Sequence, residues 1–242
     1  MYFYGQGVAQ DHVQALSWYR KAAEKGQARA QFNLAKMYAE GQGTPQDYKE
    51  AKIWFRKAAD QGLANAQCEL GVLFYRGLGV PQDYSLAMAW CSKGAKQGNA
   101  VAQFYVSNLY LQGLGVSQDY TQAYKWVSMA AEQGHALSQA QLGTLYMLGK
   151  GVQQDPIQAH KWLLLAAEHG IATAQVKVGV LYALGQGVEK DSVQALKWFL
   201  LAAKKQYQPA YENIEKIKPM MTKDQIQQAY TLADDWKPVK KI

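Results

Sequence analysis

The chain has 242 residues, of which 49% are hydrophobic and 19% are charged, so it can bury a substantial core and lacks the composition of a disordered segment. Lysine and arginine outnumber aspartate and glutamate by 26 to 19, but the excess is spread thinly along the chain, with no basic-aromatic block or RNA-binding signature. These features argue against a nucleic-acid-binding protein.

Membrane and disulfide signals are equally weak. The sequence has no run of about 18 apolar residues that would predict a membrane-spanning helix. The residues after Met1 do not show the basic and then apolar pattern of a signal peptide, so we expect a soluble chain of unknown compartment. Cys68 and Cys91 are the only cysteines, too few for a disulfide scaffold or a four-ligand zinc site. We expect two free, buried thiols.

The strongest feature of the sequence is a 36-residue repeat that recurs without insertion. One tryptophan, two glycines and one aspartate keep their places through six copies. The tryptophans are Trp18, Trp54, Trp90, Trp126, Trp162 and Trp198. The glycines run from Gly5 to Gly185 and from Gly7 to Gly187, and the aspartates run from Asp11 to Asp191, all in steps of 36. This regularity predicts one building block laid side by side.

The first half of each repeat predicts a helix, which we call helix A. In the second full repeat, Ala66, Leu70 and Phe74 fall four residues apart and form one stripe of a helix over 64–75. Gly77 follows and can adopt the left-handed conformation that ends a helix. The repeat therefore begins with a helix and a tight turn.

The second half predicts another helix, helix B, that begins at the aspartate. Asp83 can accept hydrogen bonds from the free amides of the first turn, and Gly98 marks the end of the helix. A capping box is predicted wherever glutamine or glutamate stands three residues after the aspartate. These residues are Gln14, Glu50, Gln122, Gln158 and Gln194.

The predicted solenoid covers residues 1–207. A pair of helices is too small to bury its own apolar face, so we predict an all-α, right-handed α-α superhelix (solenoid) of 36-residue helix-turn-helix repeats. The partial repeat is 1–27, and the full repeats are 28–63, 64–99, 100–135, 136–171 and 172–207. Residues 208–242 are predicted to hold a last helix A, a capping helix over 222–236 with Thr222 as N-cap, and a frayed tail from Lys237.

The repeat resembles a known family. Its string reads Ala-x-(Ala/Ser)-Gln-x-x-Leu-Gly-x-x-Tyr-x-x-Gly-x-Gly-Val-x-x-Asp, then Ala-x-x-Trp and Ala-Ala-x-x-Gly. It is similar to the Sel-1-like repeat, a relative of the tetratricopeptide repeat. The resemblance implies a scaffold or adaptor in signalling, protein quality control or a bacterial envelope or host-interaction complex. We expect a monomer that binds a protein or peptide, with no cofactor, no membrane insertion and no nucleic acid.

The tetratricopeptide superhelix also implies a binding face, because its concave wall is lined by helix A residues that pack neither on helix B nor on the next unit. In the polar half of this groove the corresponding residues are Arg29, Phe32, Lys36, Asn65, Val72, Tyr75, Arg76, Phe104, Asn108, Leu111 and Gln112. In the apolar half they are Leu137, Met147, Val180 and Leu184.

The change in polarity predicts that the groove accepts an extended or helical segment with an acidic end near Arg29, Lys36 and Arg76. Charge reversal at Arg29 and Arg76 should then weaken capture of the partner. In the alternative arrangement, the C-terminal helix covers the apolar half of the groove.

Catalytic and metal sites are not indicated. The Gly-x-Gly pair recurs in every unit and lacks the strand and third glycine of a dinucleotide fingerprint. His12, His135, His160 and His169 show no metal-ligand spacing, and neither Ser-x-x-Lys nor Lys-Thr-Gly occurs. A small-ligand-binding or hydrolase-like protein that uses the concave pocket is the alternative to a non-enzymatic scaffold.

Overall fold

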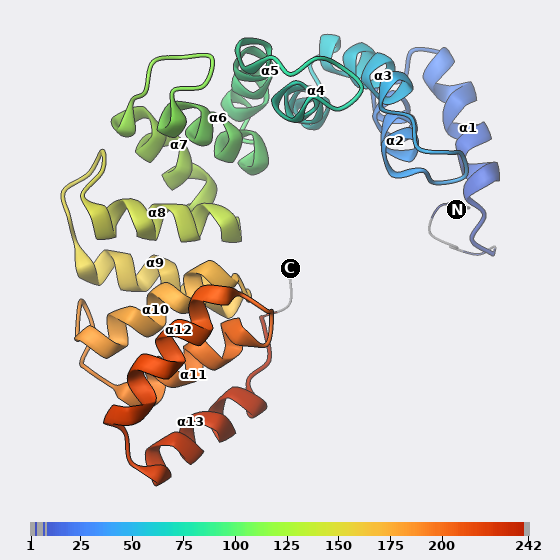
Figure 1. Ribbon diagram of the computed structural model, residues 1–242. Coiled ribbons are helices and arrows are strands. Elements are labelled where there is room, and N and C mark those ends of the chain that lie inside the picture. Colours follow the sequence, from blue (N-terminus) through green and yellow to red (C-terminus); the bar gives the residue numbers. More distant parts are fainter. Residues whose placement is uncertain (1–2, 4–6, 8, 240–242) are drawn as a thin grey trace. The chain divides into compact units, whose positions relative to one another are not determined.

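The computed structural model describes residues 3, 7 and 9–239, and over these residues the regular elements are thirteen α-helices and one short 3-10 helix (Figure 1). The chain forms two compact units, Met1–Asp119 and Tyr120–Ile242. Within each unit, successive helices of the series α1 to α6 and α7 to α12 pack on one another, and α13 packs on α11. The predicted all-α class and the solenoid of 36-residue repeats are confirmed. Gly5 lies outside the described residues, as does most of the predicted helix end before it.

Helices A and B alternate along the chain. The helices A are α2 (Ala28–Glu40), α4 (Ala64–Arg76), α6 (Ala100–Gln112), α8 (Ala136–Leu148), α10 (Ala172–Leu184) and α12 (Gln208–Ile217). The helices B are α1 (His12–Glu24), α3 (Tyr48–Asp60), α5 (Tyr84–Lys96), α7 (Tyr120–Glu132), α9 (Pro156–Glu168) and α11 (Ser192–Ala203). The 3-10 helix η1 (Lys218–Met220) and α13 (Lys223–Asp235) follow. Successive helices A also touch, since α4 contacts α6 and α10 contacts α12.

Small residues allow the two helices of a repeat to lie close together. Ala66 and Leu70 of α4 are buried as the periodicity predicts, and Ala87 of α5 is buried opposite them. Gly71 lies directly against α5, because a Cβ at this position would come within 2.9 Å of the Cys91 backbone nitrogen. The core of each repeat is therefore built largely from alanine, glycine and leucine.

The two glycines of each turn have different functions. Gly77 has φ 69° and ends α4 as predicted, with its N–H bonded to the Leu73 carbonyl. Gly79, with φ 67°, lies against the preceding repeat, because a Cβ at this position would be 2.6 Å from the carbonyl carbon of Tyr48 at the start of α3. The first glycine shapes the turn, and the second permits neighbouring repeats to stack.

Aspartate side chains cap five of the helices B, namely α1, α3, α5, α9 and α11, but the predicted capping boxes are wrong. Asp47 accepts hydrogen bonds from the N–H groups of Lys49 and Glu50 at 2.8 and 3.1 Å. A capping box also requires the Asp47 N–H, which instead donates to the Tyr38 carbonyl at 2.8 Å. The same backbone bond recurs at Asp83, Asp119, Asp155 and Asp191. A complete capping box forms at Thr222 instead, at the predicted start of α13.

Two series of glutamines, whose role the sequence analysis did not predict, satisfy the remaining helix ends. Gln82, next to the capping aspartate, donates from Nε2 to the Tyr75 carbonyl at 2.8 Å, and Gln46, Gln118 and Gln154 make the equivalent bond. Gln67 is buried and donates to the Ala59 carbonyl of the preceding repeat at 3.2 Å, as Gln31, Gln103, Gln139 and Gln175 do to theirs. Both series therefore join successive helices through carbonyls at the C-terminal ends of helices.

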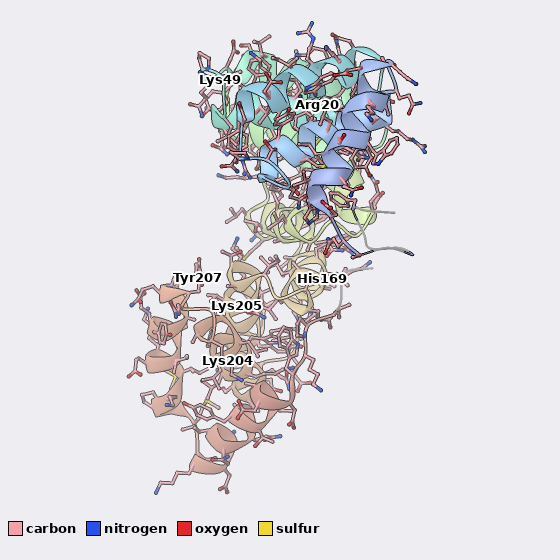
Figure 2. The ribbon with its side chains drawn as sticks, turned by 90° about the vertical axis from the view of Figure 1, so that its right-hand side faces the viewer. Arg20, Lys49, His169, Lys204, Lys205 and Tyr207 are labelled. Carbon is pink, nitrogen blue, oxygen red and sulfur yellow. The ribbon has the colours of Figure 1, made fainter. Side chains whose placement is uncertain are left out.

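The C-terminal helix departs from the repeat pattern. In place of the usual packing of helix B on its own helix A, α13 packs on α11. The ring centroids of Trp236 and Trp198 lie 6.3 Å apart. Asp234 forms an ion pair of 2.7 Å with Lys204, which is labelled in Figure 2. The predicted tail is held in place at Val239, whose N–H donates to the Glu168 carbonyl at 3.0 Å. Residues 240–242 lie outside the described chain.

The repeat 172–207 lacks the glycine that ends helix B in the other repeats. Gln206 takes that place with φ 58°, the only positive φ of a non-glycine residue in the described chain. Gln206→Gly should raise the free energy of unfolding by about 0.5–1 kcal/mol, because the left-handed conformation strains a side chain with a Cβ. Gly134→Gln, at φ 82° with open space around it, is the reverse control. A lower melting temperature for Gln206→Gly would contradict the prediction.

Candidate functional site

All predicted helix A residues of the N-terminal unit reach the surface, and we call them the N-terminal A face. Arg29, Asn65, Arg76 and Gln112 are exposed. Phe32, Lys36, Val72, Tyr75, Phe104, Asn108 and Leu111 are half-buried.

The aromatic residues of this face are less available than the sequence suggested. Phe32 packs on Phe55 of α3 with ring centroids 5.7 Å apart. Tyr75 contacts Tyr84 at 5.5 Å and Tyr105 at 5.1 Å, in edge-on geometry. The assumption that these two side chains do not pack on helix B of their own repeat was wrong, because aromatic rings are long enough to reach across to it.

The predicted cation cluster contains two acids. Lys36 pairs with Glu40 at 3.4 Å, and Arg76 donates a hydrogen bond of 2.9 Å to the Tyr105 hydroxyl. Glu69 also lies here: burial raises its pKa, while Lys36 and Arg76 oppose the shift and Glu40 adds to it. The positive potential at Lys36 and Arg76 is therefore partly neutralised.

The C-terminal unit places Leu137, Met147, Val180 and Leu184 on helices α8 and α10, and we call this the C-terminal A face. The side chains of Leu137 and Leu184 are 46% and 60% exposed, whereas Met147 and Val180 pack partly against the core. Lys177, missed because the carried-over register skips it, lies among them. It donates to the Thr144 hydroxyl at 2.6 Å, and burial lowers its pKa.

A cavity of about 420 Å³ opens on this face, and we call it the α10–α12 pocket. It is lined by Val180, Ala183, Leu184, Lys190, Ser192, Phe199, Asn213, Lys216, Ile217 and Met220. The floor is apolar, two lysines stand among the lining residues, and none of these residues is acidic. Two of the predicted site residues, Val180 and Leu184, thus meet in one cavity.

The C-terminal segment lines this cavity instead of closing it. Helix α12 supplies one wall, but α13 packs on α11. Leu184 stays 60% exposed and Met220 82% exposed. The alternative arrangement, in which the C-terminal helix covers the apolar side chains, does not hold for Leu184.

Comparison with known proteins identifies the repeat. The Sel1 repeat profile matches residues 1–27, 28–63, 64–99, 100–135, 136–171 and 172–207. The chain belongs to the Sel1 repeat family. The fold and the sequence resemblance agree with this assignment.

Two solved structures illustrate the relationship. A Sel1 repeat protein from Oxalobacter formigenes is 28% identical, with a TM-score of 0.80 over 96% of this chain and 93% of the other. A protective antigen of uropathogenic Escherichia coli with an SLR fold is 34% identical, with a TM-score of 0.66 over 97% of this chain. The present chain spans 59% of the length of that antigen. A comparison with curated proteins gave no match.

Two cysteines and one histidine of this Sel1 repeat chain are fully or partly buried. Cys68 and Cys91 are buried free thiols, and burial raises the pKa of both, that of Cys91 to about 12. His160 packs edge-on against Tyr182, and burial lowers its pKa. Over the described residues, no three His, Cys, Asp or Glu side chains gather as metal ligands, and no helix is long and apolar enough to cross a membrane.

Proposed function

We propose that this Sel1 repeat protein is a scaffold that binds a partner protein through its helix A faces, with the α10–α12 pocket as the main anchoring site. Sel1 repeat proteins are typically protein-interaction scaffolds. The observation that carries the proposal is an apolar cavity flanked by two strongly exposed apolar side chains, Leu184 and Met220. Such side chains at a cavity mark a place where a partner can exclude water.

Apolar burial would supply most of the affinity. Full burial of one leucine or methionine side chain is worth about 1.5–3 kcal/mol, so two such residues and the floor beneath them can anchor one or two partner side chains. Lys190 and Lys216 favour a carboxylate beside the apolar anchor. The partner segment we expect is an extended or helical stretch in which an apolar residue is followed by an acidic one.

The N-terminal A face would add polar contacts. Arg29, Asn65 and Gln112 are exposed and offer donors to a partner backbone or carboxylate. Because Glu40 and Glu69 neutralise part of the charge, we expect this face to contribute less than the pocket. Leu137 and Met147 would extend the apolar contact area on the C-terminal A face.

The proposal is tested by placing a charge in the pocket. In affinity enrichment from the source cells, Leu184→Asp should recover specific partners at roughly one tenth of the amount recovered by the unmodified chain, since it puts a carboxylate on the apolar anchor. Ile157→Asp is the matched control, because Ile157 is 67% exposed on helix B α9 and outside the pocket. Charge reversal at both Arg29 and Arg76 should give a smaller loss, about threefold.

The melting temperature of each variant must equal that of the unmodified chain for the comparison to hold. Equal recovery of the same partners on Leu184→Asp and Ile157→Asp would rule out the pocket as the anchor.

A further inference from the structure

Folding gathers basic residues on the helices B of the N-terminal unit. Helices α1, α3 and α5 together contain eight lysines and arginines and three acidic residues. Helices α2, α4 and α6 contain three basic and two acidic residues. Two of the cations, Arg20 and Lys49, are labelled on this unit in Figure 2. Counting along the sequence hides this asymmetry, because helices A and B alternate.

Several of these cations lie over the tryptophans of the repeat. Lys21 lies 4.8 Å from the ring centroid of Trp18, and Lys57 and Lys93 each lie 4.0 Å from those of Trp54 and Trp90. Each lysine follows its tryptophan by three residues, so the three pairs occupy equivalent places in successive repeats. In the C-terminal unit the same positions hold Met129, Leu165 and Leu201. We call the surface formed by α1, α3 and α5 the basic-aromatic face.

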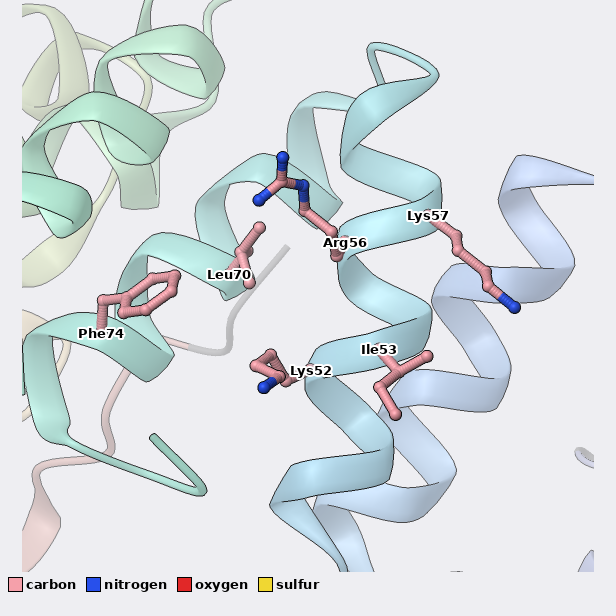
Figure 3. A pocket seen from close by; sticks show the side chains of 6 residues that line it. All are labelled: Lys52, Ile53, Arg56, Lys57, Leu70 and Phe74. Atoms are coloured by element: carbon pink, nitrogen blue, oxygen red, sulfur yellow. The ribbon is translucent and has the colours of Figure 1, made fainter. Parts of the chain in front are cut away.

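A pocket of about 390 Å³ opens on this face between α3 and α4. It is lined by Lys52, Ile53, Arg56, Lys57, Leu70 and Phe74. The Lys57 amino group lies over the Trp54 ring on the other side of α3, so Lys52 and Arg56 are the cations beside the apolar floor of Leu70 and Phe74 (Figure 3). In Figure 3, Lys52 and Arg56 extend from α3 toward Leu70 and Phe74.

The arginine of the pocket, Arg56, already has partners within the chain. Its Nε lies 2.8 and 2.9 Å from the two carboxylate oxygens of Asp60, and its guanidinium lies 4.8 Å from the centroid of the Trp90 ring. Lys52 and Lys57, by contrast, form no ion pair with any acidic residue of the described chain. Lys52 beside the apolar floor and Lys57 on the other side of α3 (Figure 3) are suited to a ligand that is both acidic and apolar and that lies across this helix.

The chain itself shows what such a ligand can look like. Helix α13 carries Asp224, Asp234 and Asp235, and it packs on a helix B. Its contact combines an aspartate on Lys204 with Trp236 against Trp198. On the basic-aromatic face, Trp90 is only 6% exposed beneath Arg56 and Lys93, but Trp18 is 58% and Ile53 42% exposed, so over the described residues α1 and α3 have no similar cover.

We propose that the basic-aromatic face docks an acidic amphipathic helix of a partner protein. One apolar side chain of that helix enters the pocket against Leu70 and Phe74, one carboxylate pairs with Lys52 beside the pocket, and another pairs with Lys57 on the other side of α3 (Figure 3). A nucleic acid or an anionic membrane would use the charge and leave the apolar floor without a function. The pocket floor comes from helix A α4, but none of the residues that line the pocket belongs to the helix A faces proposed above, so the two surfaces are separate.

The test uses a phage-displayed library of helical peptides selected on the full chain. The enriched peptides should carry Asp or Glu within one turn of Leu, Phe or Trp. A selected peptide should bind the Lys52→Glu/Lys57→Glu variant about tenfold more weakly, because each substitution brings like charges together. Its affinity for the unmodified chain should also fall as salt is added.

Two control variants separate this proposal from the others. Lys161→Glu makes the same kind of charge change at an exposed lysine near a tryptophan ring of α9, and peptide binding should be unchanged. Leu184→Asp should also leave binding intact, so failure of the pocket on α10 is distinguishable from failure here. Three results would overturn the proposal: enrichment without acidic residues, equal binding by the Lys52→Glu/Lys57→Glu variant, or tighter binding of oligothymidylate or phosphatidylglycerol vesicles than of any selected peptide.

Discussion

Gly79→Ala is expected to destabilise the chain by at least about 3 kcal/mol, through two separate costs. A residue with a Cβ at positive φ is strained by about 1–2 kcal/mol. The added methyl group would also lie 2.6 Å from the carbonyl carbon of Tyr48, a backbone atom that cannot rotate away. The turn must then separate from the start of α3, which weakens the stacking of two repeats. Urea denaturation followed by far-ultraviolet circular dichroism measures the loss.

Gly62→Ala is the matched control for this prediction. Gly62 has φ 87°, yet a Cβ there would meet nothing within 4 Å. This variant should therefore show only the conformational cost, about 1–2 kcal/mol. If both alanine variants lose the same stability, close stacking at Gly79 does not contribute, and the second glycine series needs another explanation.

Helix boundaries could be predicted closely from the sequence because each has a local cause. The expected helix over 64–75 is found at Ala64–Arg76, and the expected helix over 222–236 is found at Lys223–Asp235. A glycine in the left-handed conformation ends the first, and Thr222 with Gln225 begins the second. The hydrogen bond of the Asp47 N–H was not foreseen, because its acceptor, the Tyr38 carbonyl, depends on how the turn folds back.

The binding faces were harder to predict because they depend on rotation about each helix and on long side chains. The position of Val180 and Leu184 was found from the repeat register, but the cavity that joins them requires α12, which is not a regular repeat. Glu69 and Lys177 were overlooked, since the carried-over register skips both positions. The packing of α13 on α11 has no local signal at all, because it depends on which surface the last repeat leaves uncovered.

The six tryptophans occupy equivalent repeat positions, yet their burial cannot be predicted from the repeat alone. One register position gives a 58% exposed side chain at Trp18 and a 3% exposed one at Trp198. Lys21 lies over the ring of Trp18, whereas Trp236 of the C-terminal segment packs against Trp198. The same residue type in the same repeat position should therefore contribute very differently to stability.

Trp198→Ala is expected to cost about 3–5 kcal/mol, because it leaves a cavity between α11 and α13. Trp18→Ala should cost less than about 1 kcal/mol, since little apolar surface is buried there. Trp198→Phe is an informative intermediate, in which the smaller ring should cost about 1–2 kcal/mol. Removal of the Trp198 Nε1–H adds no further cost, because this buried group has no hydrogen-bond partner in the described chain. The three melting curves decide the matter. Similar losses for Trp18→Ala and Trp198→Ala would mean that the tryptophan acts within its own repeat, and that the cover provided by α13 adds nothing to its contribution.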